Sequence, residues 1–322
     1  MKAIVCTHYG PPDQLQFTEV TKPVPKDDEV LIKIHAASVN PVDRFFRGTP
    51  LFIRMLTGLR KPKDPRVGAD VSGQVEAVGR NMTQFKPGDE VFGLCRGAFA
   101  EYGCARENKL ALKPANISFE NAAAVPVAAI TGLQGLRDKG QIQQGQKVLV
   151  DGASGGVGTF AVQIAKSFGA EVTAVCSTKK MDTARSLGAD HVIDYTREDF
   201  TQSGQRYDLI FAANAHHSIF DYRRALKPKG IYVFAGGGWN PILQSTLLGP
   251  LLSLLGTKKM RFVMAKINQK DLIVLKDLIE TGKVAPIIDR RYSLRGVAEA
   301  FLYLEEGHAQ GKIVITVEHG DA

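Results

Sequence analysis

The order of apolar and polar residues divides this chain into two parts with different periodicities. Short apolar or alternating runs, separated by Gly and Pro, fill about the first 120 residues. Turn sequences such as Lys86-Pro87-Gly88-Asp89 join them, because Pro presets φ and Gly accepts a left-handed conformation. The pattern predicts a β-rich part with strands at 2–6, 29–36, 67–78, 90–93 and 98–105.

The second part begins after a run of small residues, Asn121 to Leu136, which predicts a connecting helix. Beyond it, apolar strand-like runs alternate with helical periods at 147–150, 157–168, 171–176, 181–187, 207–211 and 231–234. Such alternation is typical of a parallel sheet with helices on both faces. The last residues predict helix, strand, helix and strand at 272–280, 286–292, 297–305 and 312–317, a return to the first part.

The expected fold class is therefore α/β, with a β-rich domain and a doubly wound parallel-sheet domain. We place the first at 1–124 and 267–322 and the second at 125–266. The composition, 44% hydrophobic and 23% charged over 322 residues, is that of a folded globular protein and excludes extensive disorder. The longest apolar stretch, Ile242 to Leu255, contains polar residues, is shorter than the ~20 residues of a membrane span, and is expected to be buried or to face a partner.

The net charge of +8 is not gathered into basic runs, the longest being Arg60-Lys61-Pro62-Lys63. This spread disfavours nucleic-acid binding as the main function. The four cysteines, Cys6, Cys95, Cys104 and Cys176, lie far apart, and Met1-Lys2 runs directly into a strand-like segment. We therefore expect a reduced, cytoplasmic setting.

The most informative motif is Asp151-Gly152-Ala153-Ser154-Gly155-Gly156-Val157-Gly158, between a predicted strand and a predicted helix. It matches G-x-G-x-x-G with the first glycine replaced by alanine. Free N–H groups at the helix start would bind a pyrophosphate, which predicts a dinucleotide site. The alternative is a glycine turn that only packs closely. The expected cofactor-binding residues here are Ala153, Ser154, Gly155, Gly156, Val157 and Gly158.

The residues after the second strand of this part indicate which nicotinamide cofactor binds. An NAD site places an acidic residue there, but the strand at 171–176 is followed by Ser177-Thr178-Lys179-Lys180. Hydroxyl and ammonium groups suit a 2′-phosphate, so NADPH is expected rather than NADH. The alternative for the two lysines is a solvated flank of the next helix.

Several motifs along the chain together resemble one family. They are Tyr9-Gly10-Pro11-Pro12, Ala37 to Asp43, Gly68 to Gly73, Pro87 to Val91, Pro126 to Leu136, Gly152 to Gly158 and Leu187 to Tyr195. The sequence resembles the zinc-independent branch of the medium-chain dehydrogenase/reductases, the quinone oxidoreductase (zeta-crystallin-like) group. The resemblance implies a GroES-like catalytic domain, a Rossmann domain and an active site in the cleft between them.

The same resemblance bears on metal binding. Zinc-using relatives place a Cys where this chain has Asn40, and Gly-His-Glu where it has Gly68-Ala69-Asp70. The four-cysteine lobe that holds structural zinc has no counterpart, since no C-x-x-C occurs here. We expect neither a catalytic nor a structural zinc. His216-His217 do not change this, because adjacent residues of a strand point to opposite faces.

The resemblance also implies roles for single residues. Ser177, Lys180 and Tyr195 match positions that hold the adenosine 2′-phosphate. Asn40 and Asp43 match an Asn-Pro-x-Asp segment at the catalytic cleft, where Asn40 contacts substrate or nicotinamide; a turn-stabilising amide is the alternative for Asn40. The remaining implied cofactor contacts are Thr131, Phe234 and Gly236, with an ordinary glycine turn as the alternative for 234–238.

Together these features predict a zinc-free, NADPH-dependent oxidoreductase that transfers hydride to a quinone or an α,β-unsaturated carbonyl. Without a Lewis acid the small-molecule acceptor must already be activated, as these conjugated compounds are. No side chain stands out as the proton donor. The alternative is a cofactor-binding protein acting as an RNA-binding or membrane-peripheral module, based on the net charge, Arg60–Lys63 and the apolar segment 242–255. By resemblance, a homodimer is expected.

Overall fold

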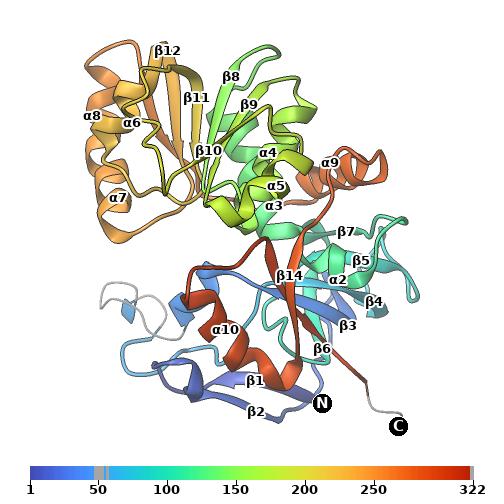
Figure 1. Ribbon diagram of the computed structural model, residues 1–322. Helices are drawn as coiled ribbons and strands as arrows, with labels where there is room; N and C mark the ends of the chain where they lie inside the picture. The colour runs from blue at the N-terminus through green and yellow to red at the C-terminus, as the bar shows by residue number, and fades with distance from the viewer. Residues whose placement is uncertain (47–53, 56–57, 320–322) are drawn as a thin grey trace. The chain divides into compact units, whose positions relative to one another are not determined.

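The computed structural model describes residues 1–46, 54–55 and 58–319, and the chain forms two compact units (Figure 1). Unit 1 contains Met1–Val127, Ile267–Glu280 and Pro286–Ala322, and unit 2 contains Ala128–Lys266 and Thr281–Ala285. The five residues 281–285 are held in unit 2 by Gln163, whose side-chain amide donates to Ala285 O (3.0 Å) and accepts from Ala285 N (2.8 Å). The sequence pattern did not predict that the chain returns to unit 2 for these five residues.

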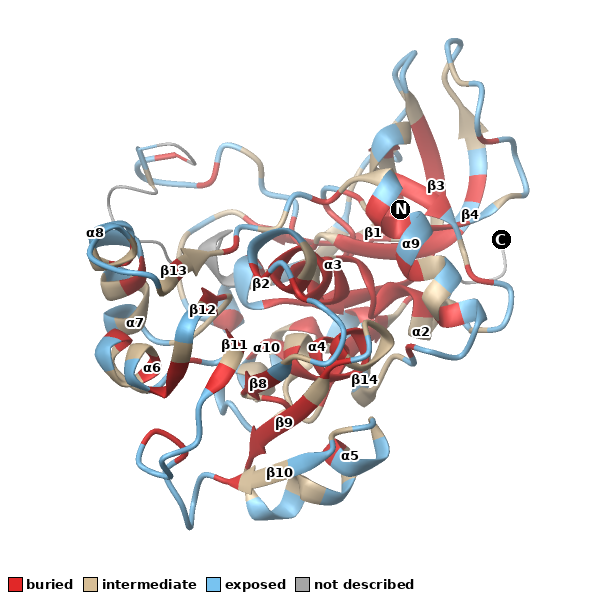
Figure 2. Cartoon of the chain, turned by 90° about the horizontal axis from the view of Figure 1, so that it is seen from above, coloured by how far each residue is buried: buried red, intermediate tan, exposed pale blue. Residues whose placement is uncertain are grey.

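Unit 2 is built on a six-stranded parallel sheet. Its strands are β8 (Lys147–Asp151), β9 (Glu171–Cys176), β10 (His191–Asp194), β11 (Tyr207–Ala212), β12 (Leu226–Phe234) and β13 (Lys259–Phe262). They lie in the order β10-β9-β8-β11-β12-β13, which is the strand order of a Rossmann domain. Val148, Leu149 and Val150 of β8 are fully buried, as strands covered on both faces must be (Figure 2). The predicted doubly wound sheet is confirmed.

The helices of unit 2 follow the strands in alternation. They are α3 (Pro126–Gln134), α4 (Gly156–Ser167), α5 (Met181–Ser186), α6 (Ile219–Ala225), α7 (Trp239–Leu243) and α8 (Gly249–Leu254), with short turns of helix η4 (Gly135–Lys139), η5 (Thr178–Lys180) and η6 (Gln244–Leu248). Among the described residues, no helix is long and apolar enough to cross a membrane. The apolar segment 242–255 belongs to the consecutive helices α7, η6 and α8.

Unit 1 is built on a sheet that is antiparallel except for the parallel pairing of its edge strand β14 with β15, and the end of the chain completes it. Its strands are β1 (Lys2–Cys6), β2 (Leu15–Glu19), β3 (Glu29–Val39), β4 (Asp70–Val78), β5 (Glu90–Leu94), β6 (Tyr102–Arg106), β7 (Leu110–Leu112), β14 (Ile288–Ser293) and β15 (Lys312–Thr316). The main sheet has the order β14-β15-β3-β4-β5-β7, and β6 also pairs with β3. Strand β15 is antiparallel to β3, with Val314 opposite Ser38. This pairing brings Lys312 beside Asn40.

Short helices surround the sheet of unit 1. They are η1 (Pro12–Gln14), η2 (Pro41–Phe46), η3 (Glu107–Lys109), α2 (Phe119–Ala123), α9 (Gln269–Glu280), η7 (Leu294–Gly296) and α10 (Val297–Glu305). The core of the unit lies between the sheet and α10, where Phe99 and Phe301 meet edge to face with ring centroids 6.0 Å apart.

The structure differs from the sequence prediction mainly in short elements. The single connecting helix predicted at 121–136 is divided into α2 and α3, because Pro126 has no N–H to continue the first helix. The pattern also missed β2, β7, β10, β13 and α6. Each strand among these has three to five residues, too few for a clear period.

Candidate functional site

The glycine loop of unit 2 joins β8 to α4, as the motif predicts. Gly155 is the N-cap of α4 and no side chain caps the helix. The first backbone hydrogen bond of the helix runs from Thr159 N to Gly155 O (3.0 Å), so the N–H groups of Gly156, Val157 and Gly158 precede it. Such N–H groups, together with the helix dipole, favour an anion at this end of α4.

The two glycines of the motif have different structural roles. A Cβ on Gly158 would lie 2.0 Å from Gly152 O, so only glycine allows the helix to pack against the loop. A Cβ on Gly155 would meet nothing nearer than Gly152 O at 3.7 Å. Gly155 is therefore not required for packing within the chain, and the space beside it is open to a ligand. Ala153 is fully buried under the loop, and Ser154 is half-buried.

The three residues expected at a 2′-phosphate lie at the ends of two neighbouring strands. Cys176 is paired with Asp194 in the β9–β10 ladder, and Tyr195 N donates to Cys176 O (3.1 Å). Ser177 is the N-cap of η5, and Lys180 N donates back to Ser177 O (2.9 Å). The parallel pairing thus gathers Ser177, Lys180 and the exposed Tyr195 at one edge of the sheet.

Asp194, which the sequence reasoning did not single out, organises this edge. Its buried carboxylate accepts hydrogen bonds from the Thr178 hydroxyl and from both the N–H (3.0 Å) and the hydroxyl (2.7 Å) of Thr196. The Thr178 hydroxyl bond contributes most to lowering the pKa of Asp194, and Arg197 adds to the effect. Asp194 therefore ties η5 to the turn after β10. The Asp-x-Thr spacing, typical of an Asx turn, was the available sequence signal.

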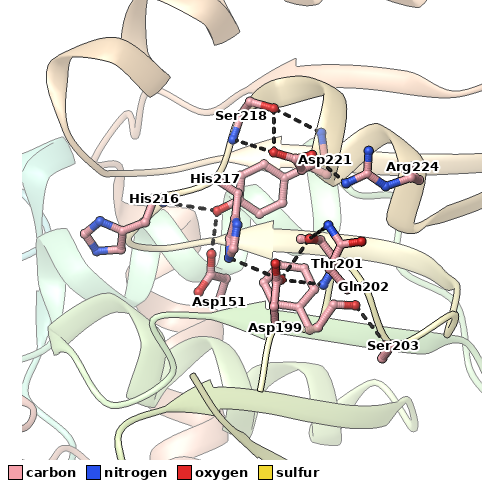
Figure 3. Close-up of polar contacts among 12 residues, drawn as sticks. Asp151, Asp199, Thr201, Gln202, Ser203, His216, His217, Ser218, Asp221 and Arg224 are labelled. Carbon is pink, nitrogen blue, oxygen red and sulfur yellow. Dashed lines mark hydrogen bonds and ion pairs between the residues drawn. The ribbon is translucent and has the colours of Figure 1, made fainter. Parts of the chain in front are cut away.

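At the start of the glycine loop, the side chain of Asp151 at the end of β8, labelled in Figure 3, makes a buried hydrogen bond with Tyr222 of α6. The Tyr222 hydroxyl donates to Asp151 Oδ2 (2.5 Å) and accepts from His216 N (3.2 Å). Burial raises the pKa of Asp151, although the bond from Tyr222 opposes the shift, and burial also raises the pKa of Tyr222. The contact fixes the end of β8, and hence the origin of the loop, relative to α6.

The adjacent histidines do not form a joint site. Figure 3 shows His216 directed away from His217. His216 is exposed, whereas the half-buried His217 lies edge-on to Phe200 (centroids 5.0 Å apart) with Nε2 3.9 Å from Asp199 Oδ1. Both residues lie in the loop after β11 and not in a strand.

The remaining expected cofactor residues of unit 2 divide into one loop position and two packed side chains. Gly236 lies in the loop after β12, with its N–H bonded to Ala212 O (3.2 Å) and its carbonyl to Ala215 N (2.8 Å). Phe234 is buried in the core and stacks on Phe262. The side chain of Phe234 therefore packs within the unit, and the cofactor contact that the resemblance implies for this residue stays a prediction. Thr131 is buried on α3.

In unit 1, Asn40 and Asp43 form one turn. Asn40 N donates to Asp43 Oδ2 (2.8 Å), and Asp43 N donates to Asn40 O (3.0 Å). These reciprocal hydrogen bonds lie at the start of η2, and both side chains are buried. The Asn-Pro-x-Asp spacing thus codes for a turn, with Asp43 rather than the Asn40 amide as its stabilising side chain.

The Asn40 side chain is instead turned inward, onto a buried polar cluster made by β3, β4 and β15. Its Nδ2 donates to Asp70 Oδ2 (2.9 Å) and to Ser38 O (3.3 Å), while its Oδ1 accepts from Lys312 Nζ (2.5 Å). Only 2% of the Asn40 surface is exposed, and its side chain hydrogen-bonds to residues of this cluster. The expected contact of Asn40 with substrate or nicotinamide stays a prediction. Sequence reasoning missed Lys312 because it lies 272 residues away.

Asp70 is the anionic centre of this cluster. It accepts from the Ser38 hydroxyl (2.7 Å), from Asn40 and from Val127 N at the start of α3 (2.9 Å), and it lies 3.5 Å from Lys312 Nζ. Burial lowers the pKa of Lys312, and the Asp70 and Asp43 carboxylates oppose that shift. The Lys312 ammonium and the Asp70 carboxylate form an ion pair in a place that solvent does not reach.

These residues do not fit a zinc ion. The positions at which zinc-using relatives carry Cys and Glu hold an amide and a carboxylate, and the Lys312 ammonium is bonded to the amide and paired with the carboxylate. Among the described residues, no group of three or more His, Cys, Asp or Glu side chains is placed to hold a metal.

Comparisons with known proteins agree with this geometry. Residues 26–115 match the family model "Alcohol dehydrogenase GroES-like domain", and residues 187–315 match "Zinc-binding dehydrogenase". A 2-methylene-furan-3-one reductase of Solanum lycopersicum is 38% identical over 98% of this chain and 79% of its own length. An NADPH-dependent alkenal/one oxidoreductase of Arabidopsis thaliana is 36% identical with the same coverage. The solved quinone oxidoreductase from Coxiella burnetii superposes with a TM-score of 0.87, at 29% identity and 99% coverage of both chains.

Proposed function

Because this chain belongs to the medium-chain dehydrogenase/reductase family, we propose that it is an NADPH-dependent oxidoreductase that reduces a quinone or an α,β-unsaturated carbonyl. The observation that carries the proposal is the pairing of β9 with β10, which gathers Ser177, Lys180 and Tyr195 in the unit that also carries the glycine loop. The names of the relatives support the same cofactor and the same class of acceptor.

The residues present fit NADPH in two places of unit 2. The N–H groups of Gly156, Val157 and Gly158 would hold the pyrophosphate, beside the open space at Gly155. Ser177 and Tyr195 would donate hydroxyl hydrogen bonds to the 2′-phosphate, and Lys180 would neutralise its charge. The turn that Asp194 organises fixes these groups before the cofactor arrives.

We propose that the enzyme works without zinc and that Lys312 supplies the fixed cation of the buried cluster. NADPH, when bound, supplies a hydride to the acceptor. Conjugation lets the acceptor spread the resulting negative charge onto its oxygen, so the protein mainly has to hold both reactants in place. Asn40 and Asp43 are positioning residues in this scheme, because their bonds fix the turn at the end of β3.

The proposal is tested by following NADPH oxidation by the purified enzyme with a panel of acceptors. Quinones and enones are expected to support turnover, whereas saturated ketones of the same size are not. A chelator that removes zinc should leave the rate unchanged. The proposal is wrong if no quinone or enone raises NADPH oxidation above the rate in buffer, or if turnover requires added zinc.

Three further features of the proposal rest on the sequence and on the family resemblance. We propose a homodimer in the cytoplasm, with the domain boundaries expected near 124 and 267. Light scattering tests the first feature, cell fractionation tests the second, and limited proteolysis tests the boundaries.

A further inference from the structure

The order of the strands in unit 2 predicts where the nicotinamide end of a bound cofactor would lie. In the proposed function, the 2′-phosphate lies at the ends of β9 and β10, and the pyrophosphate lies at the start of α4, after β8. A dinucleotide on such a sheet extends across the point at which the strand order reverses, which is here between β8 and β11. The nicotinamide would therefore lie at the loop that follows β11, residues 213–218.

Backbone hydrogen bonds hold this loop against the loops on either side of it. Ala213 N donates to Asp151 O (2.9 Å), at the start of the glycine loop. On the other side, Ala215 N donates to Gly236 O (2.8 Å), in the loop after β12. The position of the next residue, His216, is therefore fixed by the ends of three neighbouring strands.

His216 is anchored by its main chain and not by its side chain. Its N–H donates to the Tyr222 hydroxyl (3.2 Å), which in turn donates to the buried Asp151. Its imidazole is exposed, and Figure 3 shows it directed away from His217. Within the part of the chain that the structure describes, this ring makes no hydrogen bond, ion pair or ring contact. An anchored residue with such a ring is suited to act on a bound molecule.

The other ionisable side chains around the loop are engaged within the protein. The ring of His217 lies edge-on to Phe200 and to Tyr222, with centroids 5.0 and 5.8 Å apart. Asp151 is buried and accepts the Tyr222 hydroxyl, and burial raises the pKa values of both groups. Between residues 213 and 218, His216 is therefore the side chain that can exchange a proton with a ligand.

We propose that His216 is the general acid that protonates the acceptor when an α,β-unsaturated carbonyl is reduced, an inference that rests on the proposed function. The β-carbon of the acceptor gains a hydride from bound NADPH, which leaves NADP⁺, and the electron pair of the double bond forms an enolate. The imidazolium of His216 gives its N–H proton to the α-carbon, which completes the saturated product. The exposed ring regains a proton from solvent. Imidazole suits this exchange because it gains and loses a proton near neutral pH.

Quinones should depend less on this acid than enones do. A quinone that gains a hydride becomes a phenolate, whose charge the new aromatic ring stabilises. The enolate formed from an enone lacks this stabilisation, so its reduction depends more on proton transfer to the α-carbon. Loss of His216 should therefore separate the two classes of acceptor, whereas damage to the fold or to cofactor binding would slow both alike.

The first test compares His216→Gln with the wild type on the most active enone and the most active quinone of the acceptor panel. The variant keeps the backbone bond to Tyr222, and thermal melting confirms that it folds. For the enone, kcat should fall about tenfold to a hundredfold, while for the quinone it should fall less than about threefold. His191→Gln is the control, because this exposed histidine begins β10 at the opposite edge of the sheet, and it should change neither rate.

Modification by diethyl pyrocarbonate tests the position of His216 without turnover. NADP⁺ at about ten times its Kd should slow the modification of His216 at least about fivefold and leave His191 unprotected, as measured by mass spectrometry of the peptides. The inference is overturned if NADP⁺ does not protect His216, or if His216→Gln reduces the enone like the wild type or loses both acceptors equally. A wild type that reduces neither acceptor would overturn the proposed function and this inference with it, whereas normal enone turnover in His216→Gln overturns the inference alone.

Discussion

The ammonium of Lys312 and the amide oxygen of Asn40 lie 2.5 Å apart, although 272 residues separate them in the chain. The same ammonium lies 3.5 Å from Asp70, whose side chain is fully buried. Lys312→Met would leave this carboxylate buried without its cation, which is expected to cost about 3–5 kcal/mol of unfolding free energy. Urea unfolding measures the loss.

The double variant Lys312→Met with Asp70→Asn distinguishes a charge effect from a packing effect. It removes both charges, so its unfolding free energy should lie above that of Lys312→Met alone. Equal losses in the two variants would show that Lys312 acts through its methylene chain and not through its charge.

Gly158 and Gly155 are expected to respond differently to alanine. Gly158→Ala places a Cβ against Gly152 O, so the loop must move and the unfolding free energy should fall by about 1–3 kcal/mol. Gly155→Ala finds room, with a cost of about 1 kcal/mol or less, yet should weaken NADPH binding because its Cβ occupies the ligand side of the loop. Urea unfolding and fluorescence titration separate the two effects. Unchanged NADPH affinity in Gly155→Ala would contradict the dinucleotide site.

Lys180 is expected to account for much of the preference for NADPH over NADH in binding. A charge-assisted hydrogen bond to the 2′-phosphate contributes about 1.5–3 kcal/mol, so Lys180→Ala should weaken NADPH binding about tenfold to a hundredfold and leave NADH binding unchanged. Lys179→Ala is the matched control, because this neighbour is more exposed. An equal loss for both cofactors in Lys180→Ala would mean that the lysine supports the fold of η5 rather than the phosphate.

The ionisation of Asp151 should lower the unfolding free energy of the protein as the pH rises. Burial raises the pKa of its carboxyl group in the folded state above the value in the unfolded chain. Between these two pKa values the folded state binds more protons, so this group lowers the stability as the pH rises. Asp151→Asn keeps an acceptor for the Tyr222 hydroxyl without the charge. Relative to the wild type, its unfolding free energy should therefore improve from pH 4 to pH 8; a constant difference across this range would contradict the prediction.

The thiols should be inert in the folded protein. Burial raises the pKa of Cys95 to about 12 and the pKa values of Cys104 and Cys176 to about 11. At pH 8 the thiolate fraction of the last two is about one in a thousand, so alkylation by iodoacetamide should be at least about a hundredfold slower than for free cysteine. Mass spectrometry of the peptides measures each site, and unfolding in urea should restore the ordinary rate. Fast labelling of Cys176 in the native state would show that β9 opens at its end.

The sequence predicted unit 2 more completely than unit 1. Its strands are continuous apolar runs at regular spacing, so the strands at 147–151 and 171–176 and the helix after the glycine loop emerged almost to the residue. Ser177, Lys180 and Tyr195 were grouped by the family resemblance, and the pairing of β9 with β10, whose ends lie at one edge of the sheet, brings them together. The edge strand β13 was missed because its four residues, Lys259–Phe262, are too few for their alternation of polar and apolar side chains to be recognised as a strand.

The buried cluster of unit 1 was beyond the reach of sequence reasoning for a physical reason. Its members come from strands whose register, Val314 opposite Ser38 and Ser38 opposite Asp70, is set by packing rather than by any local signal. A lysine in an otherwise apolar strand, Lys312-Ile-Val-Ile, was the one hint that a buried anion would be near.

The insertion of β15 between β14 and β3 has a consequence for the order in which the protein matures. Translation runs from the N-terminus, so β3 leaves the ribosome early, whereas its partner β15 is made after all of unit 2, which ends at Ala285. Until then, residues 36–39 of β3 keep open backbone groups and Asp70 has no cation. In a nascent chain, unit 2 can therefore fold well before unit 1. Unit 1 reaches its native state only when its last strand, β15, has been made and has paired with β3.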